Sequence, residues 1–133
     1  MNKIKLINSK FVKINAEFNP NFSGQTSAKM NIKILEIFPL KNKETFQAKY
    51  LFEVNYLDLG KISLEGSLFF STDSRTLKEL QKAWKENKIE TPDYIFITNN
   101  IIQKASIKAI QIEEEMGFPI HLRLPRVDLK NNK

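Results

Sequence analysis

The sequence predicts an α+β fold in which four antiparallel strands precede two helices, and the long second helix covers one face of the sheet. Three observations predict it. Apolar residues alternate with polar ones up to residue 72, the segments between these alternating runs are short, and helical spacing begins only afterwards. A parallel crossover needs about a dozen residues or more, so successive strands should pair antiparallel. We expect a single domain over residues 1–133.

Four alternating segments predict strands at about 3–18, 27–38, 45–58 and 61–72. The loop Asn19 to Gln25 is dense in turn formers and ends the first strand, and Gly60 suits a hairpin turn between the last two. One sheet face is expected to form the core, with Phe46, Tyr50, Phe52, Ile62, Leu64 and Leu68. Some apolar residues are expected on the other face: Leu35, Ile37, Leu51, Leu57 and Phe69.

Helical spacing predicts a helix at about 74–88 and another at 92–116. Pro92 suits the first turn of the long helix, and Gly117 suits its left-handed cap. The apolar stripe that should dock this helix on the sheet is Ile95, Ile102, Ala105, Ala109, Ile112 and Met116. A second strip is expected to contact another subunit: Ile97, Ile101, Ile107 and Ile110. An extended apolar tail is expected over 118–127.

Composition excludes several kinds of protein. The net charge is +6, but lysines occur in every segment, so we interpret the charge as a solvated basic surface. The chain has no cysteine, which excludes disulfides and fits a reducing compartment. Charged residues interrupt the N-terminus before a signal-like apolar run forms, and no apolar run is long enough to span a bilayer. We therefore expect a cytoplasmic protein without membrane insertion.

Catalytic motifs are absent from the sequence. His121 is the only histidine, and we expect it to be a half-exposed tail side chain and not a catalytic base or metal ligand. The run Glu113 to Glu115 is expected to be a solvated helix end. Four glycines in the chain provide no phosphate-binding loop. The sequence thus predicts no enzyme activity, no cofactor and no metal.

The order of elements and the C-terminal segment together resemble the SecB family of export chaperones and its archaeal and bacterial SecB-like relatives. The resemblance rests on Thr91-Pro92-Asp93-Tyr94-Ile95-Phe96, on Ala105 and Ala109, and on the tail segments Gly117-Phe118-Pro119-Ile120-His121-Leu122 and Leu124-Pro125-Arg126-Val127. It implies a SecB-like fold and an ATP-independent holdase that binds unfolded or partly folded polypeptides, assembled as a dimer or tetramer. Since the family's export chaperones are acidic and this chain is basic, another pathway, such as that of a general holdase or of a partner in a toxin–antitoxin pair, fits at least as well as protein export.

The resemblance also implies where clients would bind, in apolar grooves formed by the loop after the first strand, the sheet and the long helix. The candidate client-binding residues are Phe18, Phe22, Leu35, Ile37, Leu51, Phe69, Phe118 and Ile120. Such a holdase needs exposed apolar surface and no catalytic group.

Two other functions remain open from the sequence. A nucleic-acid-binding module would use the lysines, and a continuous stripe of Lys29, Lys33, Lys49, Lys104 and Lys108 on the fold would support it. The aromatic row of the third strand resembles a base-stacking platform, but its apolar neighbours favour a core face, so nucleic acid is the less favoured partner. A non-catalytic subunit of a complex would use the same apolar surfaces for one fixed partner.

Overall fold

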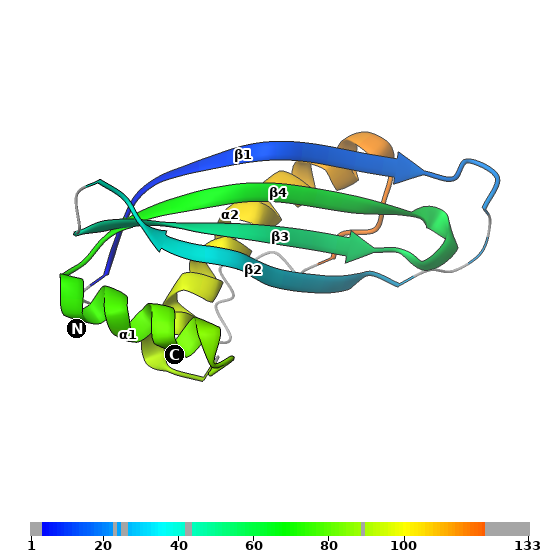
Figure 1. Ribbon diagram of the computed structural model, residues 1–133. Helices are drawn as coiled ribbons and strands as arrows, with labels where there is room; N and C mark the ends of the chain where they lie inside the picture. The colour runs from blue at the N-terminus through cyan, green and yellow to red at the C-terminus, as the bar shows by residue number, and fades with distance from the viewer. Residues whose placement is uncertain (1–3, 23, 25–26, 42–43, 89, 122–133) are drawn as a thin grey trace, which may run out of the picture.

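The computed structural model describes residues 4–22, 24, 27–41, 44–88 and 90–121, and it confirms the predicted fold class (Figure 1). A four-stranded antiparallel sheet is followed by two helices. The strands are β1 (Lys5–Phe18), β2 (Lys29–Pro39), β3 (Thr45–Asn55) and β4 (Gly60–Ser71), and a 3-10 turn, η1 (Leu57–Leu59), precedes β4. The helices are α1 (Ser74–Lys85) and α2 (Pro92–Met116). Of the predicted tail, residues 122–127 lie outside the described residues.

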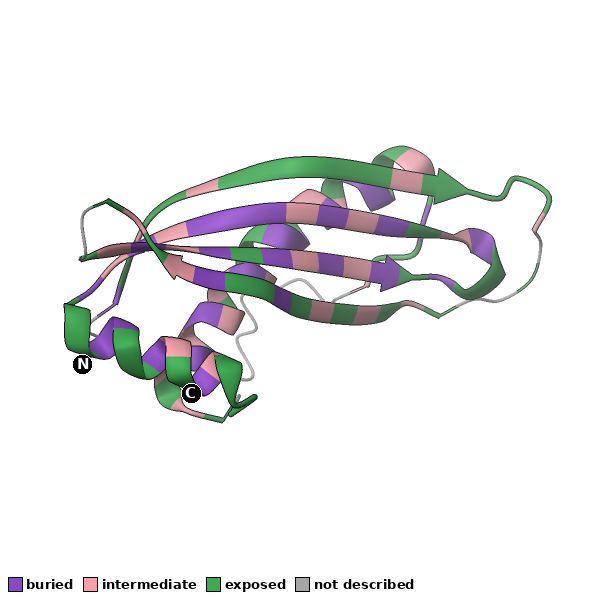
Figure 2. Ribbon diagram, in the orientation of Figure 1, coloured by how far each residue is buried: buried purple, intermediate pink, exposed green. Residues whose placement is uncertain are grey.

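The strand order is β1-β4-β3-β2, so β3 and β4 are central and β1 and β2 form the two edges. Both helices lie on one face of the sheet, which we call the inner face (Figure 1). Buried residues alternate along the two central strands, whereas β1 is exposed along most of its length (Figure 2). The core therefore lies between the central strands and α2, and α2 leaves much of β1 uncovered.

Cross-strand pairs fix the register of the central strands. Tyr50 lies opposite Gly66, and a Cβ atom at position 66 would lie only 2.7 Å from Cζ of Tyr50. The glycine therefore leaves room for the buried tyrosine ring to lie across the neighbouring strand. Burial raises the pKa of Tyr50 to about 12, as expected for a phenol held within a core.

A β-bulge in β2 corrects the prediction for Ile37. The pairing of β2 with β3 shifts between Ile34 and Glu36, which leaves Leu35 as the extra residue. Side chains alternate between the two sheet faces with a period of two, so one extra residue moves every later side chain of the strand to the face opposite the one that simple alternation predicts. Ile37 consequently lies on the inner face at 1% exposure, and its predicted place on the outer face is wrong.

Side chains cap the start of both helices, and Gly117 ends α2 as predicted. The side chain of Asp73 accepts hydrogen bonds from the backbone N–H and the hydroxyl of Thr76 at the start of α1. Thr91 caps α2, and Gly117 ends it in the left-handed conformation (φ 82°). α1 ends at Lys85, earlier than the sequence pattern predicted, and Asn87 takes a positive φ of 58° shortly afterwards.

The face of α2 that docks on the sheet differs from the predicted stripe. Its buried apolar residues are Tyr94, Ile97, Ile101, Ala105, Ala109 and Ile112. Ile97 and Ile101 were predicted to lie on a separate outer strip, but they are fully buried in the core of their own chain. Ile95, predicted to dock, is exposed. The helix carries isoleucines on both strips, so spacing alone could not determine which strip faces the sheet.

Candidate functional site

An open apolar groove runs between the edge strand β2 and the two helices. It consists of two adjoining hollows, of about 210 and 630 Å³, which share Ile32, Ile34 and Tyr94 in their walls. We define the β2 groove by its apolar residues Ile32, Ile34, Leu35, Trp84, Tyr94 and Ile95. A concave surface of this kind is a reasonable candidate for a binding site.

The groove exists because α2 crosses the sheet obliquely. Its N-terminal end lies beside β2 and its C-terminal end lies behind β1 (Figure 1). One wall of the groove is β2 and the other is the first turns of α2. Tyr94 and Ile95 line it from the helix, and Ile32 and Ile34 line it from the strand. Their aliphatic and aromatic side chains make the floor apolar.

Helix α1 closes one end of the groove and ties it to β2. Trp84 Nε1 donates a hydrogen bond to the carbonyl of Ile34 at 3.3 Å, and Gln81 Nε2 donates to the carbonyl of Ile37 at 3.2 Å. These bonds satisfy backbone acceptors at the second half of the edge strand. Among the described residues, no strand pairs with the other edge of β2, so its first half presents backbone groups beside the apolar floor.

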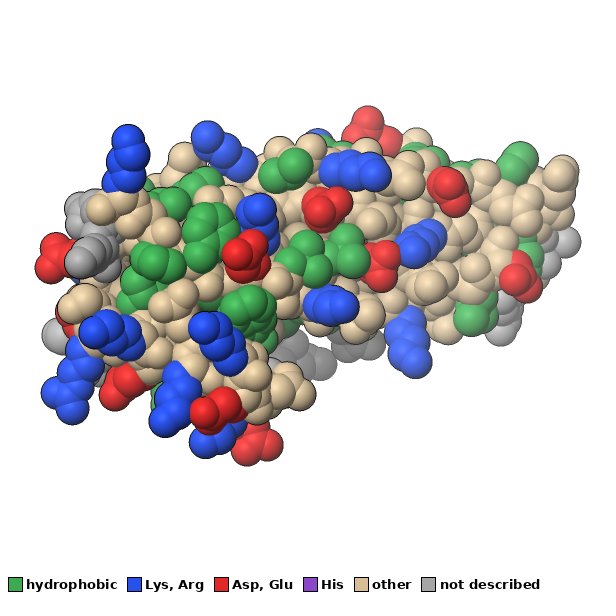
Figure 3. Space-filling model, in the orientation of Figure 1, with side chains coloured by type: hydrophobic (Ala, Val, Ile, Leu, Met, Phe, Trp, Pro, Cys, Tyr) green, Lys and Arg blue, Asp and Glu red, His purple; other side chains and the backbone are tan. Residues whose placement is uncertain are grey.

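The outer face of the sheet is mixed in character. Hydrophobic side chains gather over one half of this face, with acidic and basic side chains interspersed among them (Figure 3). Leu51 and Phe69 are half-buried there, each between two buried inner-face residues of its own strand. Lysines lie over two of the aromatic rings, Lys10 over Phe69 at 5.7 Å from the centroid and Lys49 over Phe38 at 5.5 Å.

Beyond Gly117 the chain turns back onto the sheet and seals the far end of α2. Phe118 stacks on Tyr56 with ring centroids 4.3 Å apart, and meets Phe18 edge-on at 5.2 Å. Its ring would lie 2.9 Å from a Cβ atom at position 60, so glycine is needed there. At 5% exposure, Phe118 is a core residue and is unavailable to a partner in this conformation.

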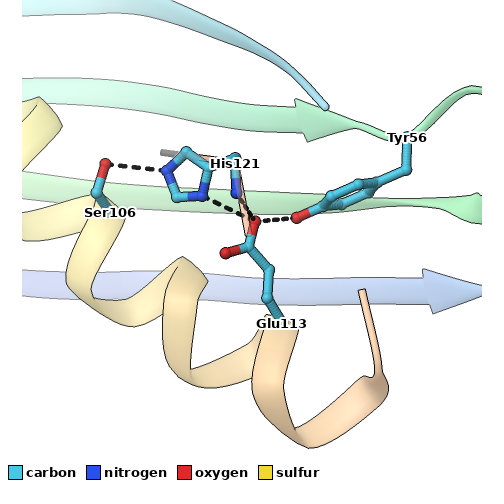
Figure 4. A network of polar contacts seen from close by, with 4 residues as sticks. All are labelled: Tyr56, Ser106, Glu113 and His121. Atoms are coloured by element: carbon cyan, nitrogen blue, oxygen red, sulfur yellow. Dashed lines mark hydrogen bonds and ion pairs between the residues drawn. The ribbon is translucent and has the colours of Figure 1, made fainter. Parts of the chain in front are cut away.

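A buried polar network lies beside this aromatic contact (Figure 4). Tyr56 donates a hydrogen bond from its hydroxyl to Oε2 of Glu113. The same oxygen accepts the backbone N–H of His121 at 3.1 Å and lies 2.8 Å from Nδ1 of its ring. The other ring nitrogen lies 3.1 Å from Oγ of Ser106. The side chains of Glu113 and His121 are fully buried, so the predictions of a solvated Glu113 and a half-exposed His121 are wrong.

Burial and the carboxylate of Glu113 together keep Tyr56 protonated. Burial raises the pKa of Tyr56 most, and the hydrogen bond to Glu113 and the charge of that carboxylate raise it further. Tyr56 therefore stays protonated and acts as a donor. Oε1 of Glu113 has no hydrogen-bond partner within the described ranges, although it is buried. A buried carboxylate is costly unless it is well paired, so the strength of this network depends on Oε2.

Ser106, His121 and Glu113 share the connectivity of a catalytic triad, but their surroundings differ from those of an active site. The serine and the histidine are buried, and none of the four hollows found among the described residues is lined by any of the three. A nucleophile needs room for the reacting atom beside it. The geometry instead anchors the segment from Gly117 to His121 onto α2 and β3, with the His121 ring 5.7 Å from that of Phe52.

The structure places the predicted client-binding residues in several regions. Leu35 lines the β2 groove, and Leu51 and Phe69 lie on the outer face, as expected for that face. Phe22 is half-buried against the core, Phe18 lies at the end of β1, and Ile120 is exposed beyond α2. These residues do not form one surface. Of the predicted interface, Ile107 is 55% exposed and Ile110 is half-buried.

Sequence reasoning missed most of the groove. Ile32 and Ile34 fall in the predicted second strand and Trp84 in the predicted short helix, but none was expected to line a site. One signal in the sequence could have indicated the groove. The second strand is apolar, and the amphipathic helix that could cover it is short, so part of the strand's apolar surface is expected to stay uncovered. In the described part of the chain, no three acidic, histidine or cysteine side chains gather to hold a metal ion. Nor does any described helix combine the length and apolarity needed to cross a membrane.

Comparison with known proteins supports the fold. No protein family's sequence profile matches this chain, and no curated protein matches it. Among solved structures, it is similar to the Mycobacterium tuberculosis SecB-like chaperone Rv1957 in complex with a ChAD peptide from the antitoxin HigA1 (Rv1956). The TM-score is 0.65 at 10% identity, and the match covers 95% of this chain and 91% of that one. At this identity the likeness shows that the chain has a SecB-like fold.

Proposed function

We propose that this chain is an ATP-independent chaperone, a holdase that binds unfolded or partly folded polypeptides without catalysing a reaction. One observation carries the proposal: the β2 groove is open and apolar, and it is bordered by the first half of an edge strand that pairs with no other described strand on that side. Ile95 is 45% exposed and Leu35 is 37% exposed, so both can contact a partner without rearrangement of the core. The SecB-like fold supports this function because the structural neighbour holds a peptide.

The groove suits an extended polypeptide better than a small molecule. A segment lying along β2 could pair its backbone with the first half of the strand edge, which requires no particular sequence. Its apolar side chains would cover Ile95, Trp84 and Tyr94, and each Å² of apolar surface removed from water contributes about 25 cal/mol. Selectivity would then come from whether a client is unfolded and apolar.

The peptide held by the structural neighbour derives from an antitoxin, which favours a toxin–antitoxin partner over protein export as the setting for this chain. The lysines do not favour nucleic acid. Lys29 and Lys49 lie on the outer face, Lys33 lies on the edge strand β2 at the rim of the groove, and Lys104 and Lys108 belong to α2 on the inner side, so the five form no continuous stripe.

We also propose that the outward side of α2 joins two copies of the chain through Ile107 and Ile110. An exposed isoleucine on a helix that is already docked is more easily explained by a partner helix than by solvent. Sedimentation at the mass of a dimer or tetramer would support this assembly, and a monomer at all concentrations would rule it out.

The holdase proposal is tested by aggregation of a chemically unfolded client in the absence of nucleotide. We expect the wild-type chain to suppress aggregation of several unrelated clients, and the double variant Leu35→Gln/Ile95→Gln to lose most of that activity. Val12→Gln is the matched control, because Val12 is 72% exposed on the opposite edge strand. Equal suppression by the double variant, with its fold intact by circular dichroism, would contradict a role for the groove. Suppression of a single client only would indicate a dedicated subunit instead.

A further inference from the structure

Among the described residues that line the β2 groove, the charged ones are all lysines. Its lining includes Lys33 from β2 and Lys85 from the end of α1, together with the polar Asn87, Thr98 and Asn99, and it includes no aspartate or glutamate. Both lysines are exposed. Within the described part of the chain, neither ammonium group has a carboxylate at ion-pair distance, and the adjacent Glu86 pairs with Lys88 at 3.1 Å.

From this arrangement we infer that the β2 groove selects apolar peptides that also carry carboxylates, and disfavours apolar peptides that carry lysine or arginine. This inference rests on the proposed function. The apolar floor supplies contact area regardless of sequence, whereas Lys33 and Lys85 flank it with unpaired positive charge. The net charge of +6 acts in the same direction by attracting acidic segments.

The outer face of the sheet differs from the groove, because it carries charges of both signs. On the outer face, Lys61 pairs with Glu53 at 2.9 Å, and Lys13 and Lys49 lie opposite Glu65 and Glu36 in the strand register. On that face, carboxylates therefore lie beside part of the positive charge. The described lining of the groove contains no carboxylate, so a ligand carboxylate is the group that would pair with its lysines.

The test uses three short fluorescent peptides with the same apolar core, flanked by aspartates, serines or lysines. Fluorescence anisotropy should show the acidic peptide binding about fivefold more tightly than the neutral one, since each exposed ion pair changes affinity only a few-fold. The lysine-flanked peptide should bind most weakly. Raising the salt from about 0.02 M to about 0.5 M should remove these differences while leaving the apolar contribution, because the screening length falls to a few Å.

A pair of charge-matched variants assigns the effect to the groove. Lys33→Gln/Lys85→Gln should abolish the preference for the acidic peptide, whereas Lys29→Gln/Lys49→Gln, with the same change in net charge, should keep it. Equal binding of the acidic and neutral peptides by the wild-type chain would overturn the inference and leave the holdase proposal standing. If none of the three peptides binds, both proposals fail.

Discussion

The two halves of α2 differ in what lies beside them. At the N-terminal half, Tyr94 and Ile95 face β2 across an open apolar groove. At the C-terminal half, the returning segment packs Phe118 onto Tyr56 and buries His121 against Glu113. Both halves dock on the sheet through the same apolar stripe, so docking alone does not close the flanks of the helix. The flank beside the C-terminal half is sealed because the chain returns to it. The flank beside the N-terminal half is left open and is available for binding.

The largest expected effect on stability comes from removing Glu113, the shared acceptor of the polar network at the sealed C-terminal half of α2. Replacing Glu113 with alanine leaves the Tyr56 hydroxyl and the His121 ring without their shared acceptor. We expect Glu113→Ala to lower the free energy of unfolding by about 3 kcal/mol, the scale for leaving a buried polar partner unpaired. Glu114→Ala is the matched control, since its side chain is exposed, and it should change stability by about 0.5 kcal/mol or less. Urea unfolding of the two variants measures both, and similar losses would contradict the role of the network.

The next largest effect concerns stability at alkaline pH, where tyrosines in the two halves should contribute differently. The pKa values of these tyrosines are higher in the folded chain than in the unfolded chain. Above about pH 10 the unfolded chain therefore loses these protons first, and the free energy of unfolding falls as the pH rises. Tyr50 gives the scale, because its shift from 10.0 to about 12 corresponds to about 2.7 kcal/mol.

In the sealed half, burial, the hydrogen bond to Glu113 and its charge all raise the pKa of Tyr56, whereas burial alone raises that of Tyr94 in the groove. Tyr56→Phe should therefore reduce the alkaline loss of stability more than Tyr94→Phe, as followed by urea unfolding at neutral pH and near pH 12. The reverse order would mean that the network is not closed.

The smallest expected effect concerns Ser106. Because the serine is buried and lines no described hollow, Ser106→Ala should cost about 1 kcal/mol of stability, the value of one neutral hydrogen bond. A fluorophosphonate probe should leave the native protein unlabelled. Labelling at Ser106 that disappears in Ser106→Ala would show that the three residues form a working triad, and would overturn the assignment of this network as an anchor.

Much of the fold could be predicted from the sequence, because alternation and turn residues are local signals. Phe46, Tyr50 and Phe52 could only form a strand facing the core, and Pro92 and Gly117 marked the ends of α2. The β2 bulge was not predictable, because the sequence around Leu35 does not distinguish a bulged residue from one that has a cross-strand partner. Ile37 was consequently assigned to the wrong face.

The candidate site was less predictable than the fold. Which of three consecutive glutamates turns inward depends on Tyr56, which lies 57 residues earlier in the chain. Likewise, the groove is created by the angle at which α2 crosses the sheet, and no local pattern encodes that angle. Leu35 was identified as a client-binding candidate, but for its expected outer-face position and not for the groove that it lines.

The most direct test of the account is site-specific photo-cross-linking to an unfolded client. A photoreactive phenylalanine analogue placed at Ile95 or Leu35 lies in the groove, whereas one at Val12 lies on the opposite edge strand. The account predicts strong client cross-links from the two groove positions and few from Val12. Equal cross-linking from all three positions, or cross-links from Val12 alone, would contradict the claim that the open flank of α2 is where polypeptide binds.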